Sequence, residues 1–113
     1  MSTTSNTTAN NITVFRGDDF ATQLVFTDTN GAPIDIIGWE IYLTVKNNKD
    51  DLDSSAVLSL TVPPTDHANG IAVVSVSNTE TNPLLGPYYY RFQFKNAAGV
   101  ITTITSGTVT FVN

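Results

Sequence analysis

The chain has 113 residues, of which 41% are hydrophobic and 13% are charged, and its formal net charge is -5. This length and composition fit one domain with one core. The five lysine and arginine residues are too few for nucleic-acid binding through phosphates, and the lack of cysteine excludes disulfides and thiolate metal sites. No stretch has the character of a secretory signal or a membrane helix, so we expect folding in a cytoplasm without a membrane partner.

Residues 1–11 form a segment rich in Ser, Thr and Asn that contains almost nothing to bury. This composition predicts a flexible N-terminal arm, followed by one domain over residues 12–113. We expect the arm to become ordered only against a neighbouring subunit or partner. Its predicted partner-binding residues are Thr3, Thr4 and Asn6.

From residue 12 onward, apolar and polar residues alternate with the period of half-buried strands, and no window shows the spacing of a helix. Seven strands are predicted, over residues 12–15, 20–27, 39–46, 56–62, 70–77, 87–95 and 100–112. In the third strand one face is expected to be core and the other to face water. The fifth strand is apolar on both faces, so its inward set stays open.

Three local signals modify this pattern. Pro63 and Pro64 end the fourth strand, because neither residue can donate to a strand ladder. Thr79 is the expected cap of a single helical turn before the sixth strand. The last strand is expected to be broken near Ser106 and Gly107, where glycine marks a bulge.

Seven short strands separated by turn signals predict an all-β fold, an immunoglobulin-like β-sandwich of about seven antiparallel strands. Trp39 lies where such sandwiches often bury a tryptophan, and we expect it in the core. Tyr88 or Tyr90, which follows a corner, has the place of a tyrosine corner. The bridging cysteines of antibody domains are absent.

Catalytic and metal-binding patterns are weak. The single histidine, His67, lies in a polar loop and is interpreted as solvated. Asp50, Asp51 and Asp53 also lie in a polar loop, and their spacing fails the EF-hand pattern. The alternative that stays open is an irregular calcium site shared with Asp28 or Asp66. We therefore predict a protein that is not an enzyme and has no cofactor or metal site.

The third and sixth strands are neighbours in such a sandwich, so their outward residues share one face. Three of the five basic residues and two tyrosines fall there, which predicts a partner-binding surface formed by Tyr42, Lys46, Tyr89, Arg91 and Lys95. A plainer interpretation is cross-strand pairing of Glu40 with Arg91 or Lys95. If the two tyrosines are buried against another subunit they indicate assembly, and if they lie open beside each other they indicate ligand binding.

Several turn motifs follow one another along the chain: "FRGDDF" at 15–20, "DTNGAPIDIIGWEIYLTVK" at 28–46 and "NTETNPLLGPYYYRF" at 78–92. Together they resemble the small immunoglobulin-like domain of tailed-bacteriophage virion proteins, in particular the N-terminal domain of upper baseplate proteins. The resemblance covers residues 12–112.

The resemblance implies a non-enzymatic structural protein of a virion that acts through protein–protein assembly. Both a capsid decoration or head-fibre protein and a tail or baseplate component stay open. Its implied partners are other virion proteins and further copies of itself, and its place is the virion, assembled in the host cytoplasm. The alternative is a carbohydrate-binding or host-surface adhesion module that uses Tyr42, Tyr89 and Arg91 on a host-surface glycan.

The first motif contains Arg16, Gly17 and Asp18, a tripeptide known from cell adhesion. We interpret it as a turn between the first two strands, with Gly17 supplying an unusual backbone angle and the aspartates accepting hydrogen bonds from turn amides. Phe15 and Phe20 flank the motif closely and are expected to pin it to the sandwich.

Overall fold

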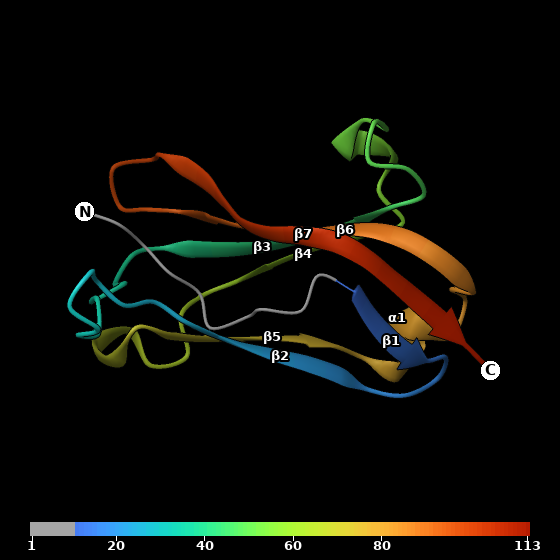
Figure 1. The fold of residues 1–113 in the computed structure, drawn as a ribbon, viewed down its shortest axis with the longest axis horizontal. Coiled ribbons are helices and arrows are strands. Elements are labelled where there is room, and N and C mark those ends of the chain that lie inside the picture. The colour runs from blue at the N-terminus through green and yellow to red at the C-terminus, as the bar shows by residue number, and fades with distance from the viewer. Residues whose placement is uncertain (1–10) are drawn as a thin grey trace.

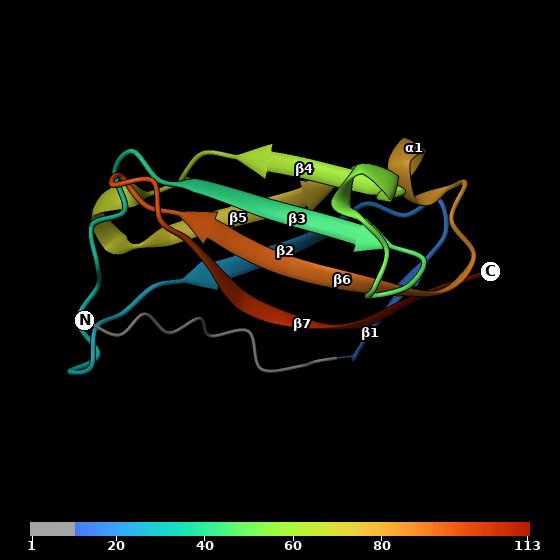
Figure 2. The ribbon, with the colours of Figure 1, turned by 90° about the horizontal axis from the view of Figure 1, so that it is seen from above.

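The computed structural model describes residues 11–113, which form two sheets packed face to face (Figures 1 and 2). The strands are β1 (Asn11–Phe15), β2 (Phe20–Val25), β3 (Glu40–Lys46), β4 (Leu58–Val62), β5 (Ile71–Val76), β6 (Gly86–Lys95) and β7 (Ile101–Val112). Short helical turns are α1 (Asn78–Thr81), η1 (Asp53–Ser55) and η2 (His67–Asn69). The predicted strands are confirmed to within about two residues at each end, but Asn11, expected in the arm, already belongs to β1.

The larger sheet has the order β1-β7-β6-β3-β4 and the smaller sheet contains β2 and β5. Neighbouring strands run antiparallel, except that β1 and β7 pair in parallel, so the expectation of a wholly antiparallel sandwich is wrong at this pair. The third and sixth strands lie side by side as predicted. The architecture is the expected immunoglobulin-like β-sandwich.

The core fills the space between the sheets. Trp39 is 7% exposed and stacks on Phe94 with 4.6 Å between ring centroids, while Phe26 meets both rings edge-on, so the prediction that Trp39 is buried is confirmed. The inward residues of β5, which the pattern left open, are Ala72, Val74 and Val76.

The cap of α1 differs from the prediction, because Ser77 and not Thr79 occupies that position. The Ser77 hydroxyl accepts a hydrogen bond from the N–H of Glu80, and the Glu80 carboxylate accepts one from the N–H of Ser77. The cap of this reciprocal capping box therefore lies two residues before the predicted one.

The last strand is continuous through Gly107, so the predicted break at that position is wrong. The pairing of β6 with β7 shifts between Phe92 and Gln93, which leaves Ile104 as the extra residue of the bulge. Ile104 packs against the core. In strict alternation along β7 the side chain of Ile104 would face away from the core. The bulge interrupts this alternation.

Candidate functional site

The loop between β3 and β4 folds back over the outer face of the larger sheet. Lys46, at the end of β3, is 3% exposed, and its Nζ donates to the carbonyl oxygens of Lys49 and Asp51 and to Oδ1 of Asp53. Thr44 is buried as well. The expectation that this face of β3 is open to water is therefore wrong at both residues. At Lys46 the reason is the loop that follows the strand, whose oxygen atoms surround the ammonium group and which strand periodicity does not describe.

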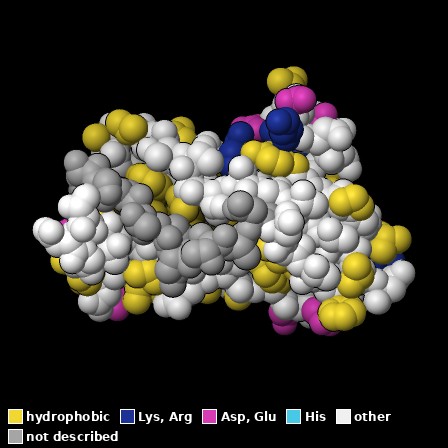
Figure 3. All heavy atoms as spheres, viewed as in Figure 1, with side chains coloured by type: hydrophobic (Ala, Val, Ile, Leu, Met, Phe, Trp, Pro, Cys, Tyr) yellow, Lys and Arg dark blue, Asp and Glu magenta, His cyan; other side chains and the backbone are white. Residues whose placement is uncertain are grey.

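Asp53 joins the loop to two strands. Its Oδ1 lies 3.2 Å from Nζ of Lys46, and Nη2 of Arg91 donates to both of its carboxylate oxygens, at 2.9 and 2.8 Å. The Lys46 hydrogen bond, followed by the Arg91 hydrogen bond and charge, holds the pKa of Asp53 below its ordinary value against the opposing effect of partial burial. Figure 3 shows Lys, Arg and acidic side chains gathered around the β3–β4 loop.

We expect Asp53→Asn to flatten the loss of stability in acid. Pairing lowers the folded-state pKa of Asp53 below the unfolded value of about 3.9, so its contribution is present at neutral pH and disappears as the pH falls through the folded-state pKa. Urea unfolding between about pH 5 and pH 2 measures this. The control is Asp50→Asn, which removes an exposed carboxylate of the same loop; equal pH dependence of the two variants would contradict the prediction.

The two tyrosines of the predicted surface do not share one site. Tyr42 pairs across the strands with Gln93, whereas Tyr89 pairs with Lys46, four positions further along β3, which is about 13 Å along the sheet. Nζ of Lys46 lies 5.6 Å from the centroid of the Tyr89 ring. The loop over Lys46 and Arg91 separates the two rings, so the arrangement of open, adjacent tyrosines is not present.

Lys95, the remaining basic residue on the outward face of β3 and β6, pairs with a residue of the neighbouring strand. Nζ of Lys95 lies 2.8 Å from Oε1 of Glu40, which confirms one of the two pairings considered for Glu40. The hydrogen bond and charge of Lys95 lower the pKa of Glu40, and Glu40 raises that of Lys95. Arg91 pairs with Asp53 instead. Thr3, Thr4 and Asn6 lie outside the described residues.

The adhesion-like tripeptide is fixed against the α1 corner. Nε and Nη2 of Arg16 donate to the carbonyl oxygen of Asn82, and Nη1 donates to Oδ1 of Asn113. The buried Thr81 hydroxyl accepts from the N–H of Gly17 and donates to the carbonyl oxygen of Asp18. These contacts confirm a turn and not a projecting loop.

Other parts of the motif agree only in part with the prediction. Gly17 has φ 81, as expected for this turn. Oδ1 of Asp19 accepts a hydrogen bond of 2.7 Å, but the donor is the N–H of Asn78 in α1 and not an amide of the turn itself. Phe20 packs against the core, but Phe15 is 57% exposed and does not pin the motif. Asp53 and Thr81 hold the two surface segments in place, and neither role was visible in the strand pattern.

Arg16→Ala is expected to lower the free energy of unfolding by about 1 to 2 kcal/mol, because two carbonyl or amide acceptors lose a charged donor. Asp18→Ala is the matched change within the same tripeptide and is expected to stay within about 0.5 kcal/mol, since the Asp18 side chain is exposed. Chemical denaturation of both variants checks the difference. Equal effects would contradict the assignment of Arg16 as the structural member of the motif.

His67 is exposed, as predicted, but it has a partner. Its Nδ1 lies 3.0 Å from Oδ1 of Asp35, which links the loop before β3 to the loop before β5 and lowers the pKa of Asp35. Within residues 11–113, no group of three or more His, Cys, Asp and Glu side chains is placed to hold a metal ion. Over the same residues, no helix has the length and apolar character needed to span a membrane.

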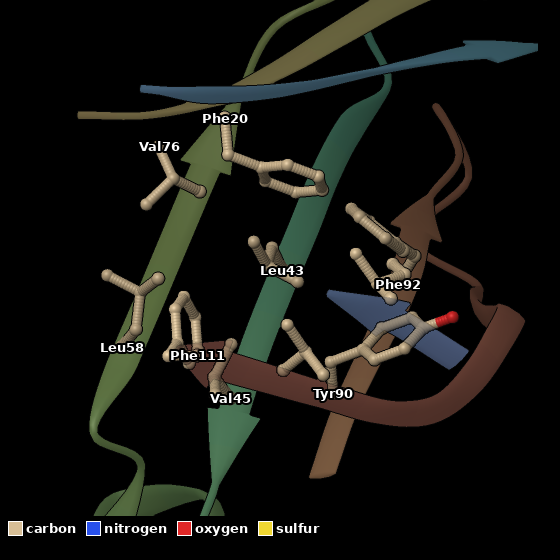
Figure 4. Close-up of a pocket in the computed structure, with 10 residues that line it drawn as sticks. Phe20, Leu43, Val45, Leu58, Val76, Tyr90, Phe92 and Phe111 are labelled. Carbon is tan, nitrogen blue, oxygen red and sulfur yellow. The ribbon is translucent and has the colours of Figure 1, made fainter. Parts of the chain in front are cut away.

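A small cavity lies in the core between the sheets (Figure 4). Its volume is about 20 Å³, which is space for one water molecule. Tyr90 is the only lining residue with a polar side chain, and burial raises the pKa of its hydroxyl, opposed by a hydrogen bond with Thr105. The cavity is a packing defect and not a ligand site. Its lining residues are Ile12, Phe20, Leu43, Val45, Leu58, Val76, Tyr90, Phe92, Val109 and Phe111.

No known family profile and no curated protein matches the chain. Among solved structures, the soluble domain of PmoD from a Methylocystis species is similar, with a TM-score of 0.51 and 11% identity over 93% of this chain and 79% of that chain. AggA, the major subunit of the aggregative adherence fimbriae type I of Escherichia coli, gives a TM-score of 0.40 and 18% identity over 98% of this chain and 95% of that chain. At these identities the likeness to PmoD concerns the fold alone.

Proposed function

We propose that this chain is a non-enzymatic structural protein of a tailed-phage virion, a component of the capsid surface, head fibre, tail or baseplate, that acts through protein–protein assembly. The observation that carries the proposal is the placement of the motif residues on which the resemblance rests. The 16–20 turn closes one end of the sandwich against α1 through Arg16, Gly17 and Asp19. A structural role suits residues that hold a rigid building block together.

The other motif residues have the same character. Oδ1 of Asp28 accepts hydrogen bonds from the N–H groups of Asn30 and Ala32, which closes the turn before Pro33. The hydroxyl of Tyr88 accepts a hydrogen bond of 3.4 Å from the N–H of Leu85, as in a tyrosine corner. These turns and corners support the resemblance because they stand at the junctions of one sandwich.

The surface supports assembly more than the binding of an anionic ligand. Of the five basic side chains, four bind groups of the same chain: Arg16, Lys46, Arg91 and Lys95. With 13% charged residues, most of the remaining polar surface is uncharged. Uncharged polar and apolar side chains are desolvated at lower cost than charges when a protein packs against a neighbour.

Purified particles from a culture that produces this chain test the proposal. We expect the chain to stay with the particles through a density gradient in a fixed ratio to the major capsid protein, measured by quantitative mass spectrometry. Cryo-electron microscopy would then show its position. Recovery of the chain only in the particle-free fraction would falsify the proposed function.

The alternative, a carbohydrate-binding or host-surface adhesion module, needs Tyr42, Tyr89 and Arg91 in one site. The structure separates the tyrosines and pairs Arg91 with Asp53, so no contact favours this function. Titration of the full chain with host cell-surface polysaccharide tests it directly. Saturable binding that Tyr89→Ala weakens would favour the alternative over assembly.

A further inference from the structure

Among residues 11–113, β2 forms an open edge of the smaller sheet. The N–H of Phe26 donates to the carbonyl oxygen of Gly70, so the alternation of an antiparallel ladder directs the backbone groups of every second residue of β2 toward β5. These residues are Phe20, Thr22 and Leu24. Ala21, Gln23 and Val25 direct their N–H and C=O groups the other way, where no strand among the described residues pairs with them.

The opposite edge of the same sheet is covered at its beginning, at Ile71 and Val73. The carbonyl oxygen of Ile71 accepts from the N–H groups of Thr65 and Asp66, and its N–H donates to the carbonyl oxygen of Asp66. The N–H of Val73 donates to Oγ1 of Thr65. The loop before β5 therefore satisfies the outward groups of Ile71 and the outward N–H of Val73, whereas no such loop is seen beside β2 among residues 11–113.

β2 also lacks the features that prevent an open edge strand from pairing with another chain. Its sequence, FATQLV, contains no charged residue and no proline, and its pairing with β5 has no bulge. The outward side chains of the two strands are all uncharged: Ala21, Gln23, Val25, Ile71, Val73 and Ser75. An uncharged edge beside an uncharged sheet face favours pairing with another strand.

We propose that β2 pairs antiparallel with β2 of a second copy of this chain, about a two-fold axis at Gln23. In this register Ala21 of one copy lies opposite Val25 of the other, and the two Gln23 residues face each other. Each outward N–H then meets a C=O, and no charged side chain of β2 faces another. Self-complementarity of this kind is what a two-fold interface requires, and a second copy in this register satisfies every outward backbone group of β2.

The inference rests on the assembly function proposed above and names one partner in it. The contact joins the two small sheets into one continuous sheet and is only one strand pair wide. We therefore expect weak association of the isolated chain. Many copies fixed on one particle raise the effective concentration of the strand, so a weak contact is sufficient there.

Sedimentation velocity of the full chain over a range of concentrations tests the contact. We expect a monomer–dimer equilibrium that Gln23→Lys weakens at least about tenfold, because the change places two like charges opposite each other on the axis. The melting temperature should stay unchanged, since the Gln23 side chain is exposed. The matched control is Ser75→Lys. It adds the same charge to the same face of the sheet, but on β5 and not on the β2 edge that forms the proposed contact.

Amide hydrogen exchange provides a second readout. In the dimer, the amides of Ala21, Gln23 and Val25 become protected as concentration rises, while that of Thr22, already directed toward β5, does not change. Concentration-independent protection of the three amides would overturn the proposal, because an occupant from the same chain would then hold the edge. A chain that stays monomeric at every concentration overturns it too.

Two further variants test the other edges, Thr13→Lys on β1 and Thr61→Lys on β4, both at exposed positions. If either abolishes the dimer and Gln23→Lys does not, the contact at β2 is wrong. Particle incorporation is scored separately. A chain that enters particles as a monomer overturns the β2 contact alone, whereas a dimer absent from particles overturns the virion function alone.

Discussion

Replacing Trp39 with alanine is expected to lower the free energy of unfolding by about 3 to 5 kcal/mol, the range for removing a large aromatic side chain from a packed core. Trp39 stacks on Phe94 and meets Phe26 edge-on, so the change removes one ring from a cluster of three. Such aromatic contacts add to the effect of burial alone. Equilibrium denaturation in urea measures the loss.

Trp39→Phe is the control, since it keeps an aromatic ring between the same neighbours. We expect a loss smaller than that of the alanine variant, because part of the stacking on Phe94 remains. An alanine variant that unfolds at the same urea concentration as the parent would show that Trp39 is not part of the core.

The second large effect is expected at Gly70, which precedes β5. Its φ of 69 lies in the left-handed region, and a Cβ there would stand 2.5 Å from the carbonyl oxygen of Phe26 and 2.8 Å from that of Ile34. Both atoms belong to the backbone and cannot rotate away. Gly70→Ala should therefore lower the free energy of unfolding by more than about 2 kcal/mol, the left-handed conformation alone contributing about 1 kcal/mol.

Gly31→Ala separates backbone strain from crowding. Gly31 has φ 83, but a Cβ there would meet nothing within 4 Å, so only the strain of the left-handed conformation applies. We expect a loss of about 1 kcal/mol. Thermal denaturation of both variants gives the comparison, and equal losses would mean that the close approach of Phe26 and Ile34 to Gly70 has no energetic consequence.

The sequence by itself determined the strand content and the sandwich. Alternation from Ile12 to Val112 reports which side chains face the core, because a strand exposes its residues on two sides with a period of two. Turn residues such as Gly31 and Pro63 marked the ends of strands for a local steric reason. The burial of Trp39 was inferred from its place in the predicted third strand; the structure begins β3 one residue later, at Glu40, and confirms the burial.

The tertiary structure decided how the surface is used, because that depends on segments far apart in the chain. Lys46 belongs to the outward set of β3, yet Asp53 and the carbonyl groups of the following loop bury it. Arg91, 38 residues away from Asp53, is paired by the same loop. Periodicity reports the side of a strand on which a residue lies and not what covers that side.

The same reason applies to the smaller sheet and to the first motif. The sequence predicted a turn at this motif, and only the structure shows that Arg16 binds Asn82, 66 residues along the chain. The fifth strand is apolar on both faces, and only its register against β2 decided which residues face inward. Within residues 11–113, that register also left the outward groups of Ala21, Gln23 and Val25 without a strand beside them, a property of the assembled sheet that no local pattern contains.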